Sequence, residues 1–160
     1  MNLNPEIKEK NLERFKLDLK DNVLLDVNKH AIYELIRDIK DPEHPLSLES
    51  LDVVDLELIQ ILEVENNIQG RNIGKKIKQI VVEFVPTIPH CSMASVIGLS
   101  IKYQLLKYIK GYWIVVNIKK DTHSNYNQLN KQLNDKDRVN AALENDTLIE
   151  MLESSIPKLL

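Results

Sequence analysis

The chain contains one cysteine, Cys91, and the residues around it are the part of the sequence best suited to chemistry. Cys91 follows a proline-bearing turn, residues 86–89, and stands where a helical pattern begins. A thiol at the start of a helix meets unpaired backbone amides and the positive end of the helix dipole, which lower its pKa and favour the thiolate. This position therefore predicts a sulfur that can act as a nucleophile or a metal ligand.

Three interpretations of Cys91 remain open on the residues alone. Free cysteine is among the most buried residue types, so packing alone would also explain it. A cysteine hydrolase or transferase would need a histidine to activate the thiol, and His44 or His123 could approach from other loops. A zinc or iron site could combine Cys91 with His90, His123 and Glu43. Because no CxxC or HxxxH spacing is present, such a site would be transient or shared with a partner.

The bulk composition narrows the class of protein. The 160 residues carry a net charge of −3, so no basic footprint for DNA or RNA is visible. No apolar run is long enough to span a bilayer, and the first 20 residues lack the hydrophobic block of a signal peptide. A lone cysteine suits a reducing compartment. We therefore expect a soluble cytosolic or nuclear protein of one domain.

The hydrophobic periodicity predicts the elements that position Cys91. Helical spacing indicates a first helix over residues 22–39, ended by Pro42 and Pro45. Strand-length apolar runs at 56–64 and 80–84 predict a hairpin whose polar loop, residues 66–76, is long and mobile. A buried helix over 92–109 leads to a strand at 113–118, which implies a parallel crossover. Three polar helices are predicted at the C-terminal end: residues 128–133, 136–143 and 148–154, the last capped by Asp146 or Thr147.

Together these elements predict an α+β fold, with a small mixed sheet of about three to four strands and helices packed mainly on one face. Residues 1–21 are rich in Lys, Glu, Asp and Asn, which is typical of a flexible lead-in. Residues 22–155 form the single predicted domain, and 156–160 a short tail.

Several blocks of residues also resemble a known family. They are IRDIKDPEHPL at 36–46, EFVPTIPHCSMA at 83–94, IGLS at 97–100, NKQLNDKDRV at 130–139 and AALEN at 141–145. These blocks occur in the same order in the eukaryotic MIP-eighteen (MIP18) family, the small subunit of the cytosolic iron-sulfur assembly targeting complex. The resemblance covers about residues 22–155.

The resemblance implies an adaptor rather than an enzyme. It implies a WD40 propeller partner, a large HEAT-repeat partner and apoprotein clients in the cytoplasm and the nucleus, with no direct contact to nucleic acid or membrane. It also implies a homodimer, in some members formed by exchange of segments. No cofactor is expected to be permanently bound, although an iron-sulfur cluster could be held transiently and zinc adventitiously.

By the same resemblance, Cys91 carries over as the reactive cysteine, and Thr87, Asp41 and Glu43 as residues of the loops near it. The residue types alone add His90 and His123 to the supporting loop residues. Cys91, His90 and His123 are the candidate metal ligands. The chain departs from the family at Asp121, where glycine is expected, and it lacks the acidic residues that commonly follow the histidine.

Overall fold

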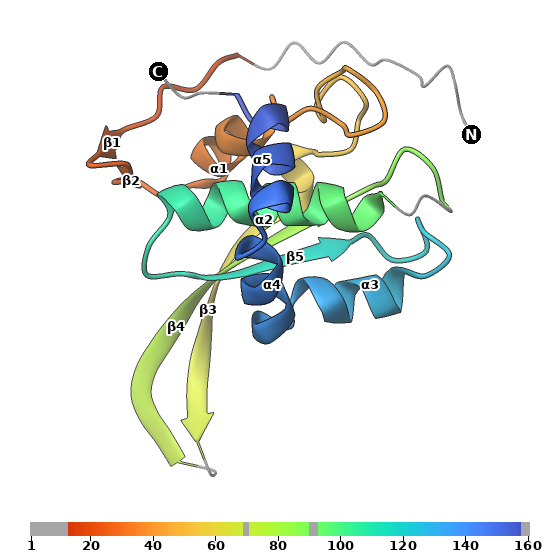
Figure 1. Cartoon of the computed structure of the whole chain (residues 1–160). Coiled ribbons are helices and arrows are strands. Elements are labelled where there is room, and N and C mark those ends of the chain that lie inside the picture. The colour runs from red at the N-terminus through yellow and green to blue at the C-terminus, as the bar shows by residue number, and fades with distance from the viewer. Residues whose placement is uncertain (1–12, 69–70, 90–92, 158–160) are drawn as a thin grey trace.

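The computed structural model describes residues 13–68, 71–89 and 93–157, and gives only the backbone course over residues 65–75. Its centre is a three-stranded sheet in the order β3–β4–β5 (Figure 1). Strand β3 (Ile59–Ile68) pairs antiparallel with β4 (Arg71–Phe84), and β4 pairs parallel with β5 (Trp113–Ile118). The mixed sheet and the α+β fold class are therefore confirmed.

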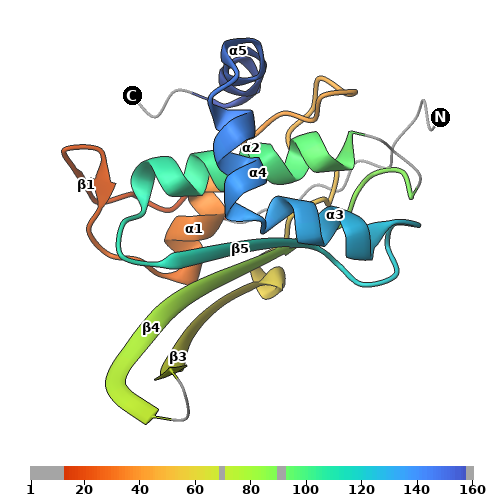
Figure 2. The ribbon, with the colours of Figure 1, turned by 60° about the horizontal axis from the view of Figure 1, so that its bottom comes forward.

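One face of the sheet forms the floor of the core. In register across it lie Ile59, Val82 and Val116, all fully buried. Helices α2 (Ala94–Tyr108) and α3 (Tyr126–Leu133) lie on this face, as Figures 1 and 2 show. The opposite face carries exposed apolar side chains, among them Leu62 and Trp113. The prediction that helices pack mainly on one face agrees with this arrangement.

Helix α2 makes the parallel crossover between β4 and β5 that the sequence predicted. Gly98, in its second turn, allows a close approach to α3. A Cβ atom added to Gly98 would lie 2.6 Å from Cδ1 of Leu133, well inside van der Waals contact. The buried Leu133 side chain therefore occupies the space that a larger residue at position 98 would need.

Two asparagines, Asn130 in α3 and Asn134 at its C-terminal cap, cover part of the free edge of β5. The side-chain amide of Asn130 pairs with the backbone of Ile118, and that of Asn134 pairs with the backbone of Val116. Both amides accept from the strand N–H and donate to the strand C=O, as a neighbouring strand would. The backbone groups at this edge are thereby satisfied without a fourth strand.

The C-terminal helices follow the predicted pattern closely. Helix α4 (Lys136–Leu143) has the predicted bounds, and α5 (Asp146–Ser155) begins two residues before the predicted start. The predicted cap of α5 was wrong, because Asn145 rather than Asp146 or Thr147 accepts the hydrogen bond from the N–H of Leu148. Asparagine is among the residues best suited to this position.

The first helix is shorter than predicted. Helix α1 spans Lys29–Ile36 and is capped by Asn28, whereas the sequence indicated a helix from residue 22. Asp21 and Asn22 both adopt positive φ and form the tight turn between β1 (Leu19–Lys20) and β2 (Val23–Leu24). Because Asp and Asn tolerate this conformation, the chain makes a hairpin where its apolar spacing suggested a helix.

The predicted long loop at residues 66–76 was also wrong. Strand β3 continues to Ile68 and β4 begins at Arg71, so the hairpin projects well beyond the helices (Figures 1 and 2). At the other end, residues Leu56–Leu58 form a 3-10 helix, η1, rather than the start of the strand. Two strands can continue to pair through backbone hydrogen bonds where their residues are polar. The polar composition of this segment therefore suggested a loop although it belongs to the strands.

Within the described residues 13–21, three apolar side chains contribute to the packed domain. Phe15, Leu17 and Leu19 lie against the core, although the sequence placed residues 1–21 in a flexible lead-in. Among the described residues, no helix combines the length and the apolar character that crossing a membrane requires.

Candidate functional site

Two loops flank the N-terminal end of α2, where the sequence placed its candidate site. Residues 40–47 approach from the side of α5, and residues 119–125 approach from the side of α3 (Figure 1). The segment that leads from β4 towards α2, residues 85–89, lies between them. Its Pro89 carbonyl accepts a hydrogen bond of 2.8 Å from the N–H of Ser124.

Asp41 organises the first loop. Its Oδ1 accepts from the backbone N–H groups of Glu43 (2.8 Å) and His44 (3.1 Å), which fixes the turn around the two prolines. The loop is tied to the domain by a 2.8 Å hydrogen bond from the N–H of Lys40 to the carbonyl of Ser155 in α5. Asp41 is 6% exposed, while Glu43 is exposed.

A pocket of about 260 Å³ connects this loop to α2 and α5. Asp41 and Pro42 line one side, and Met93, Val96 and Met151 supply apolar walls. The Oδ2 atom of Asp41 is buried and has no hydrogen-bond partner among the described residues. A buried acceptor of this kind is costly unless a donor reaches it, so the pocket edge is suited to a polar contact.

The segment after β4 is held in place by buried backbone contacts. The N–H of Val85 donates to the carbonyl of Val53, and Pro86 is buried. Thr87 is half-buried and lies two residues before Pro89. The candidate residue Thr87 is therefore on the strand-to-helix connection, next to the loop of His123.

His123 is 7% exposed, and its Nδ1 accepts a 3.0 Å hydrogen bond from the N–H of Asn125. A neutral ring that accepts at Nδ1 carries its proton on Nε2. In this arrangement, neither ring nitrogen of His123 presents a free lone pair to a metal. Asp121, where the resemblance led us to expect glycine, has φ +65°, a conformation that glycine adopts freely and aspartate tolerates.

The start of α2 carries neither a side-chain cap nor an acidic residue. Met93 provides no side-chain cap, and the first turn contains no acidic residue to offset the positive end of the helix dipole. Cys91 and His90 lie outside the described residues, so the position of the thiol stays a prediction. No group of three or more potential metal ligands gathers anywhere in the described part of the chain.

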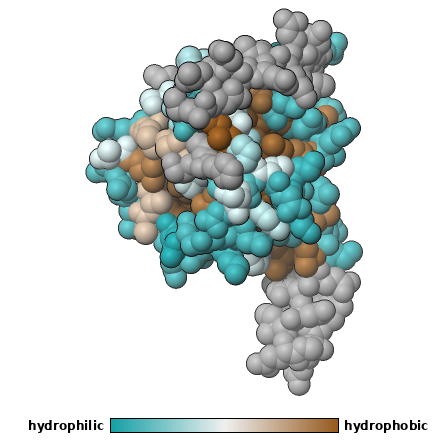
Figure 3. Space-filling model, turned by 90° about the vertical axis from the view of Figure 1, so that its right-hand side faces the viewer, coloured by the Kyte–Doolittle hydropathy of each residue, from teal (hydrophilic) through white to brown (hydrophobic). Residues whose placement is uncertain are grey.

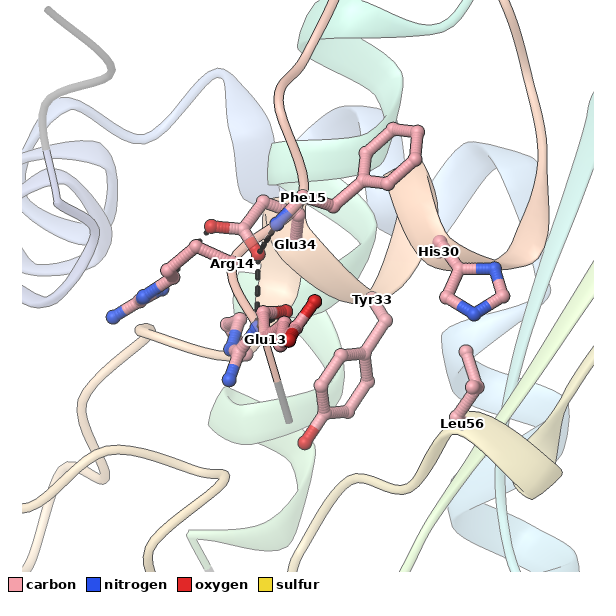
Figure 4. A pocket seen from close by; sticks show the side chains of 8 residues that line it. Glu13, Arg14, Phe15, His30, Tyr33, Glu34 and Leu56 are labelled. Carbon is pink, nitrogen blue, oxygen red and sulfur yellow. Dashed lines mark hydrogen bonds and ion pairs between the residues drawn. The ribbon is translucent and has the colours of Figure 1, made fainter. Parts of the chain in front are cut away.

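A second polar cluster, on α1, was not identified from the sequence (Figure 4). Glu34 accepts from the Phe15 N–H (3.2 Å), from Arg14 (3.1 Å) and from the buried Arg37 (3.0 Å). These residues border a cavity of about 390 Å³. The spacing of Glu34 and Arg37 was the available signal, because residues three apart on a helix face each other.

Glu49 completes this cluster from outside the helix. It accepts from Arg37 and from the Tyr33 hydroxyl, the latter at 2.5 Å. Burial raises the pKa of the Tyr33 phenol, and the hydrogen bond to Glu49 raises it further. The cluster therefore fixes the residue 13–15 segment, α1 and the turn that contains Glu49 in one arrangement.

Viewed from the right of Figure 1, the surface is mixed, with hydrophobic patches separated by hydrophilic side chains (Figure 3).

The chain is 41% identical to the MIP18 family protein galla-2 of Drosophila melanogaster over 158 residues, which cover 97% of this chain and 94% of that protein. The chain belongs to the MIP18 family. The resemblance predicted from the sequence blocks is thereby confirmed.

Other MIP18-type relatives extend the match to animals and plants. The mouse protein named cytosolic iron-sulfur assembly component 2B is 42% identical over 158 residues, covering 97% of this chain and 90% of that protein. Protein AE7 of Arabidopsis thaliana is 38% identical over 161 residues, covering 98% of this chain and 95% of that protein. No family model matches the chain.

Proposed function

We propose that this MIP18 family chain is an adaptor subunit of the cytosolic iron-sulfur protein assembly machinery, and that it helps deliver clusters to cytosolic and nuclear apoproteins. The observation that carries this proposal is the similarity over nearly the whole chain to a relative named cytosolic iron-sulfur assembly component 2B. That name describes an assembly component, which favours an adaptor over an enzyme with its own turnover.

In this proposal the cluster is cargo and the chain has no resident cofactor. The loops at the start of α2 support it, because those of Asp41 and His123 lie on either side of the segment that carries Thr87 and leads towards Cys91. Cys91 would contact the cluster or a partner briefly, while any zinc at Cys91, His90 and His123 would be adventitious. The described hydrogen bond to Nδ1 of His123 would have to open before that nitrogen bound a metal.

The proposed partners are a WD40 propeller protein, a large HEAT-repeat protein and client apoproteins, and the chain is expected to act in the cytoplasm and the nucleus as a homodimer. Affinity purification of the tagged full chain from cells, followed by identification of bound proteins, tests this assignment. Recovery of both repeat proteins is the expected result. Their absence under conditions where the chain is folded would sink the adaptor proposal.

The role of the thiol needs a separate experiment. Replacement of the native chain by Cys91→Ala should leave the fold intact and lower iron incorporation into a client enzyme severalfold. Lys107→Ala, an exposed change at the far end of the same helix, is the matched control and should leave incorporation unchanged. If iron incorporation into the client is unchanged with Cys91→Ala, the thiol has no role in cluster delivery. That result would leave the outcome of the affinity purification unaffected. A burst of product from ester or thioester substrates would instead identify a hydrolase.

A further inference from the structure

A second pocket lies at the other end of α2, away from the loops described above. Its volume is about 440 Å³, within the range of small-molecule sites. It is lined by the C-terminal half of α2, the start of β5 and the first turns of α4. The residues that matter for its chemistry are Lys102, Leu106, Tyr112, Trp113, Lys136 and Val139.

Lys102 is the unusual residue of this pocket, because it is a lysine with only 8% of its surface exposed. Its Nζ donates to the carbonyl of Leu133 at 2.7 Å and, at 3.4 Å, to Oδ1 of Asn134. Both acceptors are neutral, and no described carboxylate lies within ion-pair distance. An ammonium group has three N–H donors, so one donor and the whole charge remain uncompensated in the described part of the chain. Burial lowers the pKa of Lys102, which reflects the cost of holding this charge away from water.

The rest of the lining combines apolar side chains and one further lysine with the neutral amides of Asn134 and Asn140. Leu106 is 36% exposed at the rim, and Trp113, whose side chain leaves β5 on the opposite face of the sheet, borders the mouth at the edge of the strand and is 62% exposed. Val139 adds to the apolar wall and Lys136 adds a second positive charge, while none of the described residues that line the pocket is an aspartate or a glutamate. An apolar cavity with a buried cation at one side is complementary to a molecule with an apolar body and one anionic group.

We propose that this pocket binds an organic carboxylate with an apolar body. The carboxylate accepts hydrogen bonds from Lys102, with Lys136 at the mouth, and the body lies against Leu106 and Val139, with Trp113 beside the mouth. This site is independent of the proposed adaptor function and involves none of the residues at the start of α2.

Trp113 is the only tryptophan in the chain, so its fluorescence reports directly on the pocket. The experiment titrates the full chain with octanoate and, separately, with octanol, which has the same chain length and no charge. Octanoate should change the Trp113 emission saturably, with an affinity about tenfold or more above that of octanol, the ratio expected for a charge-assisted hydrogen bond. Equal affinities, or no saturable change with octanoate, would overturn the proposal.

Two further measurements separate the pocket from general hydrophobic binding. Lys102→Met keeps the apolar stem and should abolish the preference for octanoate, whereas Lys107→Met, on the exposed side of the same helix, should preserve it. Because Lys102 also caps α3 through Leu133, the folded state of Lys102→Met is checked by circular dichroism. If that variant does not fold, amide NMR shifts of the wild-type chain show whether octanoate binds in this pocket. Octanoate should then move the signals of Leu106 and Val139 and leave that of Val96 in place, and any other pattern contradicts the assignment.

Discussion

The side-chain amide of Asn134 forms two hydrogen bonds with the backbone of Val116, accepting from its N–H at 3.2 Å and donating to its C=O at 3.1 Å. Asn130 repeats the arrangement one turn earlier on α3, with distances of 2.7 Å and 3.2 Å to Ile118. A helix thus supplies, through two side chains, the hydrogen bonds that an edge strand normally receives from another strand.

Asn130→Ala should lower the free energy of unfolding by about 1–3 kcal/mol, because it leaves backbone groups of Ile118 without partners in a partly buried place. Urea unfolding followed by circular dichroism measures the change. Asn127→Ala, at an exposed position of the same helix, is the control and should change stability by less than about 0.5 kcal/mol. Alanine is the better helix former, so propensity cannot cause a loss, and equal losses in the two variants would show that the strand edge does not determine the effect.

Gly98→Ala should destabilise the fold by about 1–3 kcal/mol, although alanine is the better helix former, because the new methyl group would overlap the buried Leu133. The double variant Gly98→Ala with Leu133→Ala tests the cause. Its loss should be smaller than the sum of the two single losses, since the truncated side chain makes room for the methyl group. Additive losses would show that the two residues do not compete for the same space.

Tyr33→Phe should change the alkaline pH dependence of stability. The pKa of Tyr33 is raised in the folded state by burial and by Glu49, so the unfolded chain releases this proton first. The contribution of Tyr33 is therefore fully present below about pH 10 and is lost as the pH rises above it. The stability difference between wild type and Tyr33→Phe should shrink from about pH 9 to about pH 11 in urea titrations. A constant difference over this interval contradicts the prediction.

Asp121→Val should destabilise the fold by about 1–2 kcal/mol, because a β-branched residue fits poorly at φ +65°. Asp121→Gly should stay within about 1 kcal/mol of wild type, since glycine adopts this conformation without a steric penalty. Lys120→Val, at the preceding exposed residue, is the control for the loss of a surface charge. Thermal unfolding distinguishes the three variants, and a Gly variant as unstable as the Val variant would show that the backbone conformation is not responsible.

The sequence predicts the fold best where one strong local signal acts alone. Strand β5 and helix α4 have the predicted bounds, because a β-branched run follows Gly111 in one case and Asp135 caps the first turn in the other. Prediction fails where pairing with a distant segment decides the structure. Asp21 and Asn22 turn because β1 and β2 pair, and the β3–β4 ladder continues through polar residues that resemble a loop.

The candidate site was predictable only in part. The prolines and the helical pattern place residues 90–92 at the start of α2, but no local pattern indicates that residues 40–47 and 119–125 lie on either side of it. That proximity depends on contacts such as Lys40 with Ser155 and Ser124 with Pro89, far apart in sequence. Residue chemistry made His123 a candidate and the family resemblance made Asp41 one, and the geometry then placed both in the loops that flank the start of α2.

The asymmetry of the sheet limits how the molecule can associate with itself. The β5 border is occupied by Asn130 and Asn134, so an incoming chain can extend the sheet only beside β3. In a pair joined along β3, the sheet edges left at the outside would be the two β5 edges, which Asn130 and Asn134 already cover. Association by this route therefore stops at a pair and cannot propagate into a fibre.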